Sequence, residues 1–273
     1  MKITVIKPKS KWQLFEIKEL WKYKELLYIF AWRDLKVRYK QTFIGASWAI
    51  FQPLFSTFVF TIFFGNIAKI PSGDLPYSLF VLVGLIFWTY FSGILTNASN
   101  SMIENEHVIK KVYFPRLILP ASKILVSLVD FAIAFIILIA YIIFFWKAPH
   151  PNIIWLVPLG LVISSFGAVG IGLFLAAVNV KYRDVRYALP FFIQMLVFFT
   201  PVIYPTNIMR PAFARLMALN PMTSVVESIR LAVGGSGAVN WETIVISSVS
   251  AIALLIIGLV YFRSTERFFA DVI

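Results

Sequence analysis

The chain of 273 residues contains no cysteine and only two histidines, His107 and His150. The absence of cysteine excludes a disulfide framework and a thiol nucleophile, and two separated histidines argue against a histidine-rich metal site. No G-x-x-x-x-G-K-[ST] phosphate loop, G-x-S-x-G motif or H-E-x-x-H motif occurs in the sequence. We therefore expect no metal site, no ATP site and no cofactor in this chain.

Charge is also scarce. Only 14% of the residues are charged, 60% are hydrophobic, and the mean hydropathy is +0.83, whereas globular domains are nearer a quarter charged. A bilayer core needs about 20 apolar residues per helical span, and the apolar runs here supply about six spans. The composition predicts an all-α polytopic membrane protein with little material left for a soluble domain.

The apolar runs place the spans. We expect them at residues 48–65, 77–98, 122–146, 155–178, from about 187 onward, and 243–262. The fourth run contains Gly160, Gly167, Gly170 and Gly172, which suit close helix packing. The fifth contains Pro190, Pro201 and Pro205.

Two segments are apolar without being spans. Residues 12–39 form a basic amphipathic pattern with Trp12, Trp21 and Trp32, which is typical of a helix lying in the membrane interface; it can be a lipid anchor, a gate or a docking segment. Between spans five and six, residues 211–219 and 221–233 predict two short helices, the second capped by Asn220 with Pro221 at its first position. Such a pair is typical of a re-entrant hairpin.

The net charge of +12 follows from the membrane orientation. With both termini in the cytosol, the inner segments hold 20 of the 25 Lys and Arg residues, and the outer segments hold 5. This distribution obeys the positive-inside rule. The basic balance therefore does not require a nucleic-acid partner.

A charged island separates spans two and three. Residues 104–120 contain two prolines, Pro115 and Pro120, and we expect a helix of two to three turns over residues 102–113 before the break that they cause. The island can be a solvated loop or a lever on which a soluble partner acts. Glu104, Glu106 and His107 are the only acid–histidine group at one interface that could serve catalysis.

Two further features inside the spans are open to more than one interpretation. Asp130 lies well inside span three, where an acidic residue is a functional candidate by default, although a hydrogen bond to a neighbouring helix is a simpler role. Lys123 lies seven residues earlier, on the same helix face. Phe51, Phe55 and Phe58 share one face of span one and could face lipid, pack between helices, or line a pore that stacks on sugar rings.

Four separated motifs resemble one family. Residues 38–54 (RYKQTFIGASWAIFQPL), 109–120 (IKKVYFPRLILP), 182–185 (YRDV) and 219–222 (LNPM) are similar, in order and spacing, to the ABC-2 type permeases that export O-antigen, capsule and teichoic-acid polysaccharides. The resemblance extends from about residue 33 to the end of the sequence. It implies a permease subunit in the bacterial inner membrane that moves a polyprenyl-diphosphate-linked glycan.

The resemblance also implies partners and site residues. The permease would be a homodimer in membrane lipid, paired with two copies of a separate ATPase subunit that holds Mg-ATP. The site residues fall into four groups. Coupling to the ATPase would use Glu104, Glu106, His107, Lys110, Lys111 and Tyr113, and a cytosolic gate would use Arg33, Lys36, Arg38 and Tyr39. A substrate channel would be lined by Phe51, Phe55, Phe58, Phe191 and Phe198. A periplasmic gate would be formed by Asn220, Pro221, Glu227 and Arg230.

The expected organisation is a cytosolic N-terminal segment (1–46), a six-span transmembrane domain (47–262) with a coupling loop (99–121) and periplasmic re-entrant helices (206–236), and a cytosolic tail (263–273). Three alternatives stay open at this stage: an exporter of a small lipid or drug from the same superfamily, a membrane-embedded glycan-modifying transferase acting through Glu104 or Glu106, and a proton-coupled carrier acting through Asp130.

Overall fold

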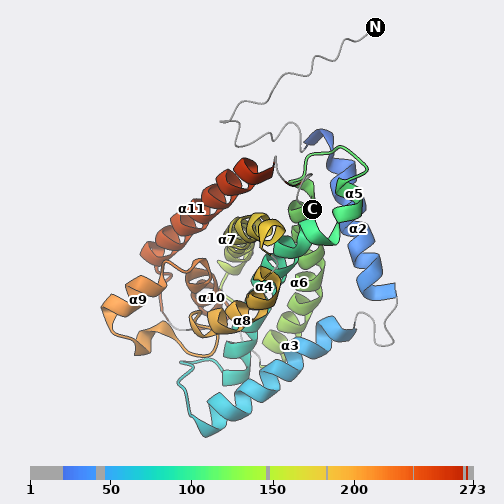
Figure 1. Cartoon of the computed structure of the whole chain (residues 1–273). Helices are drawn as coiled ribbons and strands as arrows, with labels where there is room; N and C mark the ends of the chain where they lie inside the picture. The colour runs from blue at the N-terminus through green and yellow to red at the C-terminus, as the bar shows by residue number, and fades with distance from the viewer. Residues whose placement is uncertain are drawn as a thin grey trace.

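The computed structural model describes residues 21–40, 47–145, 148–182, 184–235 and 237–266, together with Phe269, and every regular element in these ranges is a helix (Figure 1). The part of the predicted interfacial helix before residue 21, and almost all of the predicted tail after residue 266, lie outside the described residues. The all-helical membrane fold predicted from composition is confirmed.

Within these described ranges, five helices are long and apolar enough to cross a membrane. They are α3 continued by the π-helix η1 (Ser47–Ile67), α4 (Tyr77–Glu104), α6 (Ile118–Phe144), α7 (Ile153–Lys181) and α11 (Trp241–Thr265). They correspond to predicted spans one, two, three, four and six. The locations of these spans are thus confirmed, and α4 is longer than predicted because it continues past residue 98 to Glu104.

The predicted fifth span is shorter than a full span. It corresponds to α8 (Val185–Phe198), which has 14 residues, whereas a membrane crossing needs about 20. The helix ends before Pro201, and residues 199–205 form turns and bends that lead to the 3-10 helix η2 (Thr206–Ile208). A proline lacks the N–H that an α-helix needs and clashes with the preceding turn, which accounts for the early end.

The helix predicted over residues 102–113 is also corrected. Its first residues belong to the end of α4, and Asn105 then interrupts the helix. Only one turn follows, α5 (Glu106–Ile109). The chain runs without a helix through Val112–Pro115 and enters α6, where Pro120 occupies the first turn. Proline is tolerated there because the first N–H groups of a helix have no intrahelical acceptor.

The centre of the bundle is formed by α4 and α7, with α6, α10 (Pro221–Ala232) and α11 packed around them. Most residues in the apolar windows of α4 and α7 are buried, whereas α3 with η1 is almost entirely at the surface. Figure 1 shows α2 (Lys24–Lys40) and α5 on one side of this bundle and α9 (Pro211–Met217) with α10 on the other. The two short helices predicted between spans five and six are therefore present.

The glycines predicted to allow close packing in span four do so. A Cβ atom at Gly170 would lie 2.5 Å from the backbone of Leu254 in α11, and one at Gly258 would overlap the carbonyl oxygen of Gly170. Gly160 and Gly167 similarly face Val225 and Pro221 of α10. Small residues therefore bring α7 against both α11 and α10.

The Gly258→Ala variant is expected to be less stable by about 1–3 kcal/mol, because the added methyl group meets backbone, which cannot move aside as a side chain can. Thermal unfolding of the purified protein in detergent measures this loss. Val249→Ala is the matched control, because Val249 is exposed on the same helix. An unfolding midpoint for Gly258→Ala equal to that of the control would contradict the close crossing of α7 and α11.

Candidate functional site

The helix α2 is held against the bundle along α6. Phe30 and Ala31 of α2 are buried, and the Phe30 ring packs on Phe114, with ring centroids 5.6 Å apart. Leu26 and Leu27 are partly buried and also pack against the core, whereas Trp32 and Val37 remain exposed. The first half of α2 therefore attaches through apolar contacts, and ionic contacts with α6 follow along the second half.

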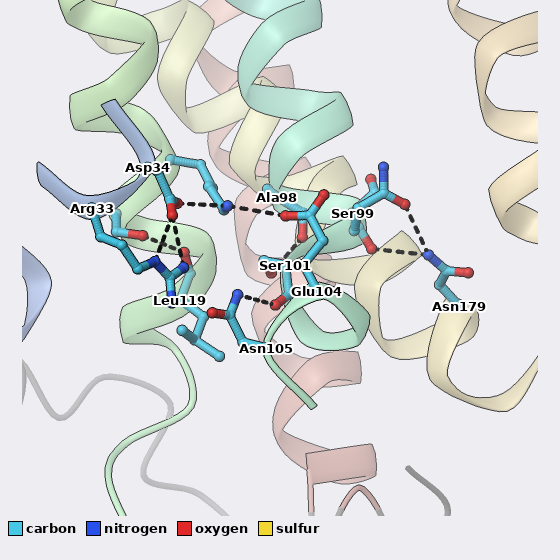
Figure 2. A network of polar contacts seen from close by, with 12 residues as sticks. Arg33, Asp34, Ala98, Ser99, Ser101, Glu104, Asn105, Leu119 and Asn179 are labelled. Carbon is cyan, nitrogen blue, oxygen red and sulfur yellow. Dashed lines mark hydrogen bonds and ion pairs between the residues drawn. The ribbon is translucent and has the colours of Figure 1, made fainter. Parts of the chain in front are cut away.

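Lys123 is the centre of the ionic contacts (Figure 2). Its Nζ lies 2.8 Å from Asp34 Oδ2 on α2 and 3.2 Å from Glu104 Oε2 at the end of α4. The Lys123 side chain is only 7% exposed, the Asp34 side chain is 17% exposed, and that of Glu104 is about half exposed. One buried ammonium group thus joins three helices, α2, α4 and α6, at the point where α4 leads into α5. We call Asp34, Lys123 and Glu104 the three-helix ion cluster.

Asp34 is held in its charged form. Burial by itself would raise the pKa of Asp34, but the hydrogen bonds from Lys123 and Arg33 and their positive charges outweigh it and lower the pKa below its usual value. Arg33 contributes two of these hydrogen bonds, at 2.9 and 2.7 Å from Oδ1. The pair of Asp34 with Lys123 is therefore ionic at neutral pH.

A second ionic contact joins α2 to α6 one turn further along. Arg38 and Tyr39 both donate hydrogen bonds to the carboxylate of Asp130. Burial, followed by the hydrogen bond to Asp130, raises the pKa of the Tyr39 hydroxyl, which therefore stays protonated. The predicted common face of Lys123 and Asp130 is confirmed, since both residues bind α2, and Asp130 forms the inter-helix hydrogen bonds that were its simpler predicted role.

The predicted coupling residues divide into two sets. Glu104 turns inward to Lys123. The others are on or after α5: Glu106 pairs with Lys110 at 2.6 Å, His107 and Lys111 are exposed, and Tyr113 is 82% exposed. The turn is anchored by Ile109, which is buried in the core. A charged, exposed surface is thus attached to the bundle directly beside the three-helix ion cluster.

The residues predicted for the second gate lie on α10 and meet the break after α8. Arg230, almost fully buried, donates hydrogen bonds to the carbonyl oxygens of Pro201 and Val202, each at 2.6 Å, and of Phe80 at 3.0 Å. Its guanidinium group also stacks on the Phe80 ring at 3.4 Å from the centroid. Arg230 therefore ties α10 to α4 and to the segment that follows α8.

Other residues of the predicted periplasmic gate also hold α10 against its neighbours. Asn220 caps α10 by accepting a hydrogen bond from the Met222 N–H at 3.0 Å, and its amide donates to Phe199 and Thr200 at 3.0 and 2.8 Å. Glu227 accepts a hydrogen bond from Thr206, and its burial raises the pKa of the carboxyl group. Pro221 packs against α7 at Gly167.

The aromatic residues predicted to line a channel are at the surface. Phe51, Phe55, Phe58, Phe191 and Phe198 are each more than half exposed. Phe51 and Phe55 stack with their ring planes 14° apart and their centroids at 5.5 Å. The structure thus presents them on α3 and α8, both of which contact α4.

Comparison with known proteins identifies the family. The family described as ABC-2 type transporter matches residues 25–233, which include four of the five long apolar helices, α8, almost all of α2 and both predicted gate regions. The chain belongs to the ABC-2 type transporter family. It is therefore a multi-pass membrane component of a transporter, as the resemblance of the four motifs implied.

Individual relatives of this ABC-2 type chain are polysaccharide exporters by name. The O-antigen export system permease protein RfbA of Klebsiella pneumoniae is 29% identical over 91% of this chain and 95% of that protein. The protein of the same name from Myxococcus xanthus is 28% identical over 78% and 81%. The polysialic acid transport protein KpsM of Escherichia coli is 24% identical over 86% and 91%.

Sequence reasoning missed one central residue of the site in this ABC-2 type chain. Asp34 is the one acidic residue among the basic residues of the second half of α2, and this irregularity was the available signal. Asn179 near the end of α7 was also missed; its amide donates to Ser99 of α4 at 3.2 Å and so extends the polar contacts to a fourth helix (Figure 2). Lys36, predicted as a gate residue, forms no ion pair with any residue that the structure describes.

Proposed function

We propose that this chain is the transmembrane permease subunit of an ATP-driven exporter that moves lipid-linked polysaccharide of the O-antigen type across the bacterial inner membrane. The family and the names of relatives that align over most of their length support this proposal. Two copies of the chain would form the pathway, and two copies of a separate ATPase subunit would bind Mg-ATP. The Lys and Arg distribution supports cytosolic termini, with α2 and α5 on the cytosolic face.

The observation that carries the proposal is the three-helix ion cluster. Only Asn105 separates Glu104 from α5, so a movement of α5 caused by an ATPase would displace Glu104. Lys123 pairs with both Glu104 and Asp34, and it therefore connects this movement to α2. ATP-dependent closure of the partner can then move the proposed gate helix α2, provided that the partner contacts α5 differently in its two states. A protein without a soluble motor would have no need for an exposed turn attached to a gate in this way.

The exposed aromatic residues of α3 and α8 suit the proposed substrate. Aromatic faces hold sugar rings without an ionic contact, so a long glycan can slide past Phe51, Phe55 and Phe58, and past Phe191 and Phe198. At the far side, the junction held by Asn220 and Arg230 would act as the periplasmic gate. The helix α4 is about 42 Å long; it contacts α10 near this junction, and its other end, Glu104, is linked to α2 through Lys123.

The Lys110→Glu, Lys111→Glu double variant is expected to insert normally and to lose most export, because reversing the charge of the exposed turn opposes docking of the partner. Surface glycan and membrane levels of the chain are compared in cells, and the co-purifying Mg-ATP hydrolysis activity is measured after mild affinity purification. The Lys69→Glu variant is the control, because Lys69 lies outside this surface. Unchanged surface glycan and an undiminished ATPase partner in the double variant would refute the coupling role of α5.

The other functions considered from sequence receive less support. For a transferase, Glu104 and Glu106 should be available to a substrate, but each carboxylate is paired with a lysine. For a proton carrier, Asp130 should exchange protons, but Arg38 binds it directly. An exporter of a small lipid or drug remains the second candidate, because the same gates would serve it. Glycan accumulation inside a deletion strain separates it from the polysaccharide exporter.

A further inference from the structure

A cavity of about 500 Å³ lies between α2, α3, α4, α6 and α8. Arg38, Tyr39 and Asp130, which form the second ionic contact of α2, line it. The wall facing them is formed by the α3 residues Trp48 and Gln52 and by a row of polar residues on α4. A cavity of this size is within the usual range for small-ligand sites.

The cavity wall carries one buried polar group that no described residue satisfies. Ser127 of α6 is only 2% exposed, it lines the cavity, and its Oγ has no hydrogen-bond partner among the described residues. The exposed amide of Gln52 and the half-buried amide of Asn97 also line the cavity, and neither forms a side-chain hydrogen bond within the part of the chain that the structure describes. A buried polar group without a partner is costly, so Ser127, with two available amides on the same cavity wall, points to a polar occupant.

The charge of the wall restricts the kind of occupant. Its one cation, Arg38, is paired with its one carboxylate, Asp130, so no free positive charge is available to a phosphate or diphosphate. An acyl chain would leave the amides and Ser127 unpaired. Hydroxyl and amide groups beside the aromatic surfaces of Trp48, Tyr90 and Phe131 match an uncharged, hydroxyl-rich ring.

We propose that this cavity binds one or two neutral sugar units of the transported glycan before they pass into the channel, with Gln52, Asn97 and Ser127 as hydrogen-bonding groups. The inference rests on the proposed function, because it takes its ligand from the glycan cargo. It adds a site within a single chain, beneath α2. The Arg38 and Tyr39 contacts with Asp130 form one wall of this site, so movement of α2 changes access to it.

The absence of cysteine in the natural chain makes a direct test available. Ser127→Cys introduces one thiol at the cavity wall with little change in size. It is labelled with N-ethylmaleimide in membranes that contain the complete transporter with a hydrolysis-deficient ATPase partner, so that glycan cannot leave. Labelling is expected to fall by about fivefold or more when the cells synthesise the glycan, relative to cells blocked in glycan synthesis. The reason is that glycan bound in the cavity keeps the reagent away from the thiol.

Two other single-cysteine variants control for general effects. Lys69→Cys lies on an exposed residue outside the coupling surface and should be labelled equally in both membranes, whereas Ser99→Cys lies on a buried residue outside the cavity and should be labelled in neither. Asn97→Cys provides a second thiol on the cavity wall if Ser127→Cys does not accumulate. A normal amount in the membrane and normal co-purification with the ATPase partner show that each variant is folded.

The outcomes separate this inference from the proposed function. Protection of Ser127→Cys and Asn97→Cys by glycan, with the controls unchanged, supports the sugar site. Equal labelling with and without glycan, in variants that still export glycan, means a water-filled cavity only and overturns the inference while leaving the proposed function intact. If glycan reaches the surface normally in a strain without this chain, the proposed function fails first.

Discussion

The Lys123→Met variant is expected to export less than about one-tenth as much glycan as the natural chain, because it removes the cation that α2, α4 and α6 share in the three-helix ion cluster. Removing one partner of a buried ion pair costs up to about 3–5 kcal/mol, and the loss of stability here should be smaller because Arg33 still pairs with Asp34. Asp34, with a side chain only 17% exposed, bears most of this cost. Glu104 is about half exposed, and water replaces much of its contact.

Matched variants separate the ionic contact from simple packing. Lys123→Arg keeps the charge and should retain much of the export. Adding Asp34→Asn to Lys123→Met removes the carboxylate whose charge balance depended partly on Lys123, and it should recover part of the stability without recovering the coupling of ATP hydrolysis to export. Surface glycan, the unfolding midpoint and ATPase activity of the purified complex are measured together. Full export by Lys123→Met would show that the three-helix ion cluster does not link α5 to α2.

The Arg230→Met variant is expected to be destabilised by about 3–5 kcal/mol, with little folded protein in the membrane. Arg230 donates to three carbonyl oxygens, and those of Pro201 and Val202 lie in the break after α8, outside any regular helix. Methionine fills part of the space but leaves these oxygens without their charged donor. Unfolding midpoints in detergent and the amount of folded protein after size-exclusion chromatography measure the effect.

Arg230→Lys tests whether the shape of the guanidinium group matters. Lysine keeps the charge, but its ammonium group cannot reproduce the fixed, planar fork that reaches three oxygens and stacks on Phe80, so we expect only partial recovery. Arg215→Met is the control, because Arg215 is exposed on the neighbouring helix α9. If Arg230→Met and Arg215→Met unfold at the same temperature, Arg230 does not hold the α8–α10 junction.

The positions of the long helices could be predicted from the sequence, because each depends on local information. An uncharged run of about 20 residues has to span a bilayer as a helix, wherever its neighbours lie. The start of α10 is also local, since Asn220 caps it two residues before Met222 and Pro221 occupies a position where no N–H is needed. The small size of the glycines of α7 is also local information, and it indicated close packing. It did not indicate which helices pack against α7.

Pro201 limits how far α8 can continue, but the groups that stabilise the ends of α8 and α5 could not be predicted, because they are distant in the sequence. The carbonyl groups that α8 leaves unpaired after Phe198 are bound by Asn220 and Arg230, which follow in the chain by about twenty to thirty residues. Similarly, α5 is held to a single turn between Ile109 in the core and the end of α4. A short helix is marginal by itself, and such contacts decide its length.

The sequence alone determined that this chain is a basic, cysteine-free, multi-span membrane protein, since composition and apolar run length decide these properties. Only the tertiary structure decided which charges meet. Lys123 and Asp34 are 89 residues apart, and Arg38 and Asp130 are 92 apart. An ion pair depends on distances of a few ångströms, which arise only after α2 packs along α6, and no sequence periodicity encodes that arrangement.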